Sequence, residues 1–198
     1  MKSPTRLKLL AAALVLVLPS LSEAGPPLIC HPFQTTTTDL LPWGDGPGWN
    51  TPDHRYDVQR LTADTLRLLS ADAPILTRME VMRRAVIYSA KDARVADQLL
   101  AAIVGRATGA GKTDRLAQFD AGYLIESYKQ ASHLHGRTVT TADGYALVKR
   151  ALDLSGGDAE MEFAAALMTT GRTSAAHLQR ARASAEALLV RNITNIGW

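Results

Sequence analysis

The chain has 198 residues, enough for one domain with a substantial hydrophobic core. Its 22 Lys and Arg residues against 19 Asp and Glu residues give a formal net charge of +3. The only cysteine is Cys30, which excludes a disulfide within the chain, so packing alone must hold the fold.

Residues 1–24 have the three parts of a secretory signal peptide. The basic start MKSPTRLK is followed by the apolar run LLAAALVLVL and then by the small-residue pattern Ser22-Glu23-Ala24. The apolar run is too short to span a membrane. We therefore expect cleavage after Ala24, export to the periplasm or the medium, and no stable membrane anchor afterwards. An uncleaved N-terminal anchor is the alternative.

Removal of this segment changes the charge balance. The segment holds three of the basic residues and one of the acidic residues, so residues 25–198 carry 19 against 18, a net charge of +1. No basic run longer than a pair follows residue 24. We therefore expect a mixed, solvated surface and no nucleic-acid partner.

Residues 25–53 differ in composition from the rest of the chain. They hold six prolines and four glycines, and neither a helical nor an alternating period runs through them. We expect an extended arm. Trp43 and Trp49 are too apolar to remain in water, so they are predicted to anchor this arm to the body of the protein.

From Asp53 onward, apolar residues recur with helical spacing, and no alternating run of strand length competes. We expect an all-α fold of about seven helices, with residues 54–198 as a single domain. The first helix is predicted to end near Ala73 and the last to run through Leu189. The predicted N-caps are Asp53, Thr77, Asp92, Thr113 or Asp114, Thr141, Asp158, and Thr173 or Ser174.

Two helical architectures remain open: stacked antiparallel hairpins and an irregular bundle. Ala85 and Ala151 lie 66 positions apart, close to two units of a repeat of roughly 33–34 residues. The stretch from Ala151 through Gly156-Gly157-Asp158 to Ala165 resembles the junction between tetratricopeptide repeats. That resemblance implies an α-α superhelix with a groove for a protein or peptide partner. Gly156 stands where the family often has proline, and the Trp-Leu-Gly-Tyr signature is absent.

The string Gly109-Ala110-Gly111-Lys112-Thr113 is similar to the end of a phosphate-binding loop. Its spacing is wrong, because Gly105 lies one position too far from Gly111, and a helical segment precedes it where a strand is needed. We expect a turn between helices and no nucleotide.

Three histidine positions have ordinary structural explanations. His133 and His135 are predicted to cap a helix end and lie in an exposed loop, and His177 is predicted to lie at the surface, as is Glu162. His54 lies between Asp53 and Asp57 and forms a polar cluster with them. This cluster either binds a ligand or, more simply, caps the helix and forms ion pairs.

Cys30-His31 is the remaining candidate for chemistry. A thiolate and an imidazole are both ligands for soft metals and haem. Two adjacent ligands complete no site, His54 is the only nearby third candidate, and the haem-attachment motif C-x-x-C-H is absent. Three possibilities stay open: a structural role, a Cys30-linked dimer, and a ligand or reactive thiol.

These patterns favour an exported, non-enzymatic helical protein that binds a protein or peptide partner or serves as a scaffold. No catalytic residue and no cofactor is expected for it. The alternative is a small metal-, haem- or redox-active protein that uses Cys30 and His31.

Overall fold

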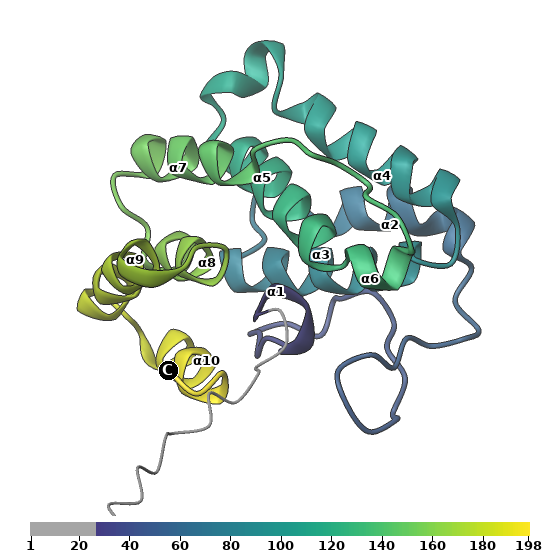
Figure 1. Ribbon diagram of the computed structural model, residues 1–198, viewed down its shortest axis with the longest axis horizontal. Helices are drawn as coiled ribbons and strands as arrows, with labels where there is room; N and C mark the ends of the chain where they lie inside the picture. The colour runs from purple at the N-terminus through teal and green to yellow at the C-terminus, as the bar shows by residue number, and fades with distance from the viewer. Residues whose placement is uncertain (1–26) are drawn as a thin grey trace, which may run out of the picture.

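The computed structural model describes residues 27–198, and the predicted signal peptide lies outside this range. Within it, the chain forms ten α-helices and two 3-10 helices and no strand, which confirms the all-α prediction (Figure 1). The helices pack in antiparallel fashion. No helix in residues 27–198 combines the length and the apolar character needed to cross a membrane.

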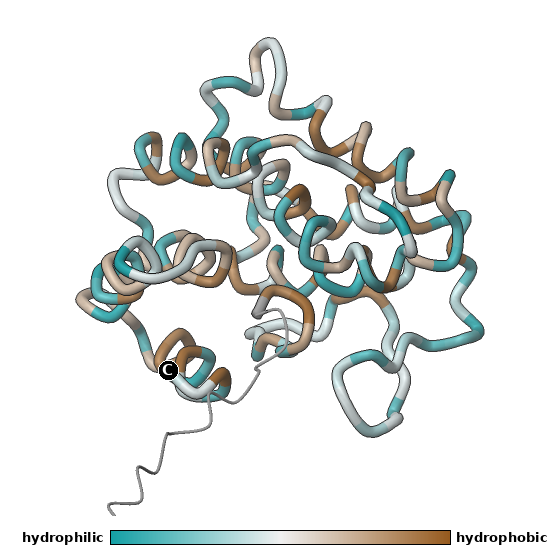
Figure 2. Tube along the Cα trace, viewed as in Figure 1, coloured by the Kyte–Doolittle hydropathy of each residue, from teal (hydrophilic) through white to brown (hydrophobic). Residues whose placement is uncertain are grey.

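The helices are shorter and more numerous than the sequence predicts. Their bounds are α1 Pro27–Cys30, α2 Leu61–Leu68, α3 Ile75–Ser89, α4 Ala93–Arg106, α5 Arg115–Gln130, α6 Ser132–His135, α7 Gly144–Ser155, α8 Ala159–Leu167, α9 Gly171–Ala183 and α10 Ala187–Asn195. The 3-10 helices are Val58–Arg60 and Gly109–Thr113. Brown and teal alternate along most of the helices in Figure 2, as expected of amphipathic helices around a core.

Three predicted N-caps are confirmed. The side chains of Asp92, Asp114 and Asp158 accept hydrogen bonds from backbone N–H groups in the first turns of α4, α5 and α8. These N–H groups have no partner within their helix, so a carboxylate at this position stabilises the helix start by roughly 1 kcal/mol.

The other predicted caps are wrong: Asp53, Thr77, Thr141, and Thr173 or Ser174. Asp57 caps the first 3-10 helix, and Asp143 caps α7 through the Ala146 N–H. Pro74 precedes α3, and Thr170 precedes α9 without capping it. Several candidate caps stand close together near these helix starts, and the backbone path selects among them.

Two predicted long helices are interrupted. The first is reduced to a 3-10 turn followed by α2, which ends at Leu68. The last is divided into α9 and α10 by extended or irregular backbone at Ser184 and Glu186. No glycine or proline marks that break, so the sequence carries no breaker signal there.

The core is centred on α3 and α5. Every residue of α3 except Arg84 is buried, and α5 is buried from Ala117 to Tyr128. Most helix contacts join neighbours or next neighbours in chain order, as in stacked hairpins. The contact of α3 with α8 is more distant in sequence and closes the helices into a bundle.

A pair of glycines lets α5 and α7 cross at very short range. A Cβ atom on Gly122 would lie 2.5 Å from the Gly144 carbonyl oxygen, and one on Gly144 would lie 2.4 Å from that of Gly122. Next to this crossing, Glu126 Oε1 accepts from the Gly144 and Tyr145 N–H groups, at 2.9 and 3.2 Å. The start of α7 is therefore held directly on α5.

The predicted arm is irregular over most of its length but is built into the core. Leu28 and Ile29, in the short helix α1, have no exposed surface, and Leu41 is almost completely buried. At the other end of the chain, the Asn192 side chain of α10 accepts from the Gln34 N–H at 2.8 Å and donates to its carbonyl at 3.1 Å. The arm therefore joins the first and last parts of the described chain.

Candidate functional site

The arm docks on two buried charged residues of α3. Glu80 and Arg83 have no exposed surface, and Arg83 Nε lies 2.8 Å from Glu80 Oε2. The Phe33 N–H donates to the same carboxylate oxygen at 3.0 Å. Arg83 Nη1 donates to the carbonyl oxygens of Ile29 and Trp49, at 3.2 and 3.0 Å. One ion pair thus ties three separate points of the arm to α3.

The two tryptophans proposed as arm anchors lie against the core and are partly buried. The Trp43 ring meets Tyr88 edge to face, with centroids 5.6 Å apart. The guanidinium carbons of Arg83 and Arg84 lie 5.0 and 5.3 Å from the same ring. Such cation–π contacts add to the apolar burial of the ring, so Trp43 is well placed to hold the arm.

Cys30 and His31 stand at the end of α1, and both are partly exposed. Burial raises the pKa of the Cys30 thiol, with Arg83 acting in the opposite direction. Burial also lowers the pKa of the His31 imidazole. Both groups are therefore held uncharged near neutral pH. Because the thiolate is the nucleophilic and metal-binding form, this environment does not activate Cys30.

His54 lies apart in an exposed turn. Its predicted polar neighbours are engaged elsewhere: Asp53 pairs with Arg55 at 3.0 Å, and Asp57 caps the first 3-10 helix. Within residues 27–198, no group of three or more His, Cys, Asp or Glu side chains is arranged to hold a metal ion. The structure does not bring His54 to Cys30 and His31.

The glycine-rich string lies in the exposed connection between α4 and α5. The Gln118 side chain donates to the carbonyl oxygens of Ala107 and Gly111, at 2.7 and 3.0 Å. A Cβ atom on Gly111 would lie 1.7 Å from the Arg106 carbonyl oxygen, so this tight turn requires glycine. These contacts give the string a structural role in the turn.

The histidines at the end of α5 separate. His133 is exposed, whereas His135 is partly buried and meets the Tyr128 ring edge to face at 5.2 Å. His135 Nε2 also lies 3.2 Å from the Val86 carbonyl oxygen. The prediction of an exposed loop position is therefore wrong for His135.

An unexpected polar cluster lies where α7, α8 and α9 meet. His177 of α9 and Glu162 of α8 are only 5% and 6% exposed, so the predicted surface positions are wrong. His177 Nδ1 lies 2.5 Å from Glu162 Oε2, and His177 Nε2 lies 2.7 Å from the Tyr145 hydroxyl oxygen of α7. Three helices therefore supply one continuous chain of hydrogen bonds.

Charge determines the direction of these hydrogen bonds. Arg180 Nε donates to Glu162 Oε1 at 2.7 Å, and this hydrogen bond raises the pKa of Arg180. Because the Glu162 carboxylate can only accept, its 2.5 Å contact assigns the proton to Nδ1, which donates to it. Arg180 Nη2, 2.6 Å from Nδ1, is itself a donor and therefore makes no hydrogen bond with that atom. Burial raises the pKa of Tyr145, which keeps its hydroxyl protonated.

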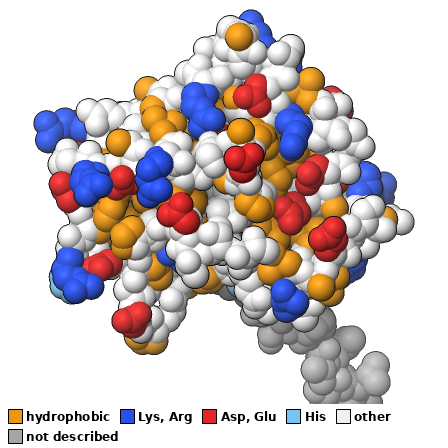
Figure 3. Space-filling view, turned by 180° about the vertical axis from the view of Figure 1, so that it is seen from behind, with side chains coloured by type: hydrophobic (Ala, Val, Ile, Leu, Met, Phe, Trp, Pro, Cys, Tyr) orange, Lys and Arg blue, Asp and Glu red, His pale blue; other side chains and the backbone are white. Residues whose placement is uncertain are grey.

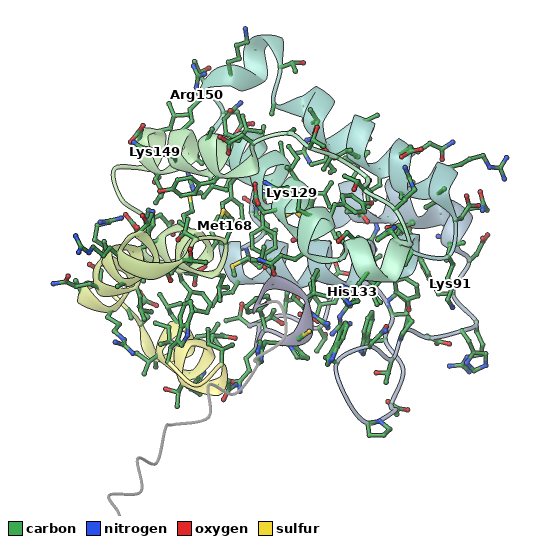
Figure 4. The ribbon with its side chains drawn as sticks, viewed as in Figure 1. Lys91, Lys129, His133, Lys149, Arg150 and Met168 are labelled. Atoms are coloured by element: carbon green, nitrogen blue, oxygen red, sulfur yellow. The ribbon has the colours of Figure 1, made fainter. Side chains whose placement is uncertain are left out.

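A cavity of about 490 Å³ opens over this cluster, a volume within the usual range for small-molecule sites. One face of α9 lines it with Arg172, Thr173 and Ala176, beside His177 and Arg180. The facing side of α7 contributes Tyr145, Lys149, Leu152 and Asp153. Figure 4 shows Lys149 on α7, on the side of the molecule where α9 also lies.

A second hollow is apolar and runs beside α4. It has a volume of about 440 Å³ and is lined by Leu100, Ala101 and Val104 of α4 together with Ile125 of α5. Asp97, at one end of this lining, pairs with Arg137 at 2.5 Å. We call this hollow the α4 groove.

Basic and acidic side chains are interspersed on the face that Figure 3 shows, with hydrophobic side chains between them. That face carries no field of a single sign. Comparison of the chain with protein-family models, with curated proteins and with solved structures finds no match.

Proposed function

We propose that this protein is an exported, non-enzymatic helical module that binds a segment of a partner protein in the α4 groove. The observation that supports this proposal is the apolar lining formed by the partly exposed Leu100 and Val104 together with Ile125, which is only 2% exposed. Apolar surface gathered in one hollow gains free energy when a partner removes it from water.

The shape and charge of the groove define the partner segment. Leu100, Ala101 and Val104 share one face of α4, so the hollow follows the helix and suits an apolar side chain of a short peptide segment. The Asp97 carboxylate is 59% exposed although it pairs with Arg137. A basic residue beside the apolar anchor would complement it.

Export is the second part of this proposal and rests on the sequence of residues 1–24. The alternative function, a metal, haem or redox role for Cys30 and His31, gains no support from the geometry. The thiol is held protonated, and His54, the third candidate ligand, lies elsewhere.

Peptides selected from a displayed random library on the protein of residues 25–198 provide the test, with affinity measured by fluorescence anisotropy. Ala101 is exposed, so Ala101→Glu places a carboxylate in the groove without disturbing the core. We expect this variant to weaken binding at least about tenfold. Ala175→Glu makes the same change at an exposed position of α9 and should leave binding unchanged. Equal affinity of the two variants would overturn the proposal.

A further inference from the structure

The polar cluster at α7, α8 and α9 is poorly explained by stability alone. Glu162 and His177 are removed from water, and the desolvation of such groups offsets much of what their pairing contributes. Replacement of a buried ion pair by apolar side chains of similar volume is often neutral or stabilising in proteins. Titratable clusters beside a cavity are typical of functional sites.

The free charge around the cavity is positive. Both Glu162 oxygens are already engaged, one by Arg180 and the other by His177. Asp153 lies 3.9 Å from Lys149, the longest ion pair in the described part of the chain. No carboxylate of residues 27–198 pairs with Arg172. The cavity therefore offers the cations of Arg172 and Lys149 to an incoming anion.

The remaining lining fits a small molecule better than a bare ion. Leu152 and Ala176 supply apolar surface from opposite helices, while the Thr173 and Tyr145 hydroxyls supply hydrogen-bonding groups. Small-molecule sites commonly combine apolar walls with a few polar groups that fix the orientation of the ligand.

We propose that this cavity binds a small molecule carrying a carboxylate or phosphate group, held by Arg172 and Lys149. The cavity is separate from the α4 groove, so this proposal does not depend on the proposed binding of a partner protein.

Isothermal titration calorimetry at constant ionic strength tests the proposal, with succinate, inorganic phosphate and the neutral analogue succinamide as probes. We expect one or both anions to bind and succinamide not to bind. Binding of succinate alone or phosphate alone identifies the preferred group.

Matched variants place the binding in the cavity. Arg172 and Arg182 are both exposed on α9, so substituting either residue leaves the core undisturbed. Only Arg172 lines the cavity. Arg172→Gln should weaken binding at least about tenfold and Arg182→Gln should not. The proposal is overturned if neither anion binds, if succinamide binds as well as succinate, or if Arg172→Gln and Arg182→Gln behave alike.

Discussion

Replacement of Glu80 by alanine tests whether the arm is an integral part of the core. The Glu80 carboxylate accepts from the Phe33 N–H at 3.0 Å, from Arg83 Nε and Nη2 at 2.8 and 2.9 Å, and from Arg84 Nε at 2.7 Å. The substitution leaves Arg83, which has no exposed surface, as a buried cation without its carboxylate. Breaking a buried pair from one side costs about 3–5 kcal/mol. That is a large part of the roughly 5–15 kcal/mol that stabilises a typical domain.

Urea unfolding followed by tryptophan fluorescence measures this cost. Because Trp43 and Trp49 lie in the arm, we also expect the native emission of Glu80→Ala to shift to longer wavelength. Glu186→Ala is the control: Glu186 is exposed, so its free energy of unfolding should change by no more than about 0.5 kcal/mol. A loss below about 1 kcal/mol for Glu80→Ala would refute the reasoning that this ion pair holds the arm.

Three further predictions concern a helix crossing, a buried carboxylate and export. Gly122→Ala should lower the free energy of unfolding by about 1–3 kcal/mol because its Cβ would meet Gly144. Gly105→Ala, whose Cβ would have open space around it, should raise the free energy of unfolding by up to about 1 kcal/mol. Equal effects of the two variants in urea unfolding would contradict the close crossing of α5 and α7. Burial raises the pKa of Asp120 to about 6, against about 3.9 when unfolded, so the native state binds more protons. The unfolding free energy of the wild type should therefore fall as pH rises from about 4 to about 6, and Asp120→Asn should remove this pH dependence. A rise in the unfolding free energy of the wild type over that range would contradict a raised Asp120 pKa. Mass spectrometry of the exported protein should find Gly25 at its N-terminus, and retention of residues 1–24 would count against a cleaved signal.

Local chemistry allowed much of the fold to be predicted. A carboxylate that accepts from N–H groups two or three residues ahead depends only on nearby residues, so Asp92, Asp114 and Asp158 were recognisable as helix starts. The break between α9 and α10 has no such local cause. The helix after the break, α10, is held on the arm by the contact of Asn192 with Gln34, which joins residues far apart in the sequence.

The polar cluster was missed although the sequence carries a signal for it. His177 lies four residues before the apolar residue Ala181 and therefore on the same helix face. Glu162 belongs to a helix that is apolar on almost all sides, and such a helix is normally buried as a whole. The polar character of Glu162, and the absence of a carboxylate four residues before or after His177, led to the prediction that both lie at the surface. What the sequence does not contain is the pairing itself, because only the packing of α8 against α9 brings the two side chains together.

The most direct test of partner binding in the α4 groove is a methyl-labelled NMR spectrum of the protein with a selected peptide bound. We predict intermolecular NOEs from the apolar anchor of the peptide to the methyl groups of Leu100, Val104 and Ile125. NOEs confined to methyl groups outside the groove, such as those of Leu152 in the α7–α9 cavity, would contradict this account.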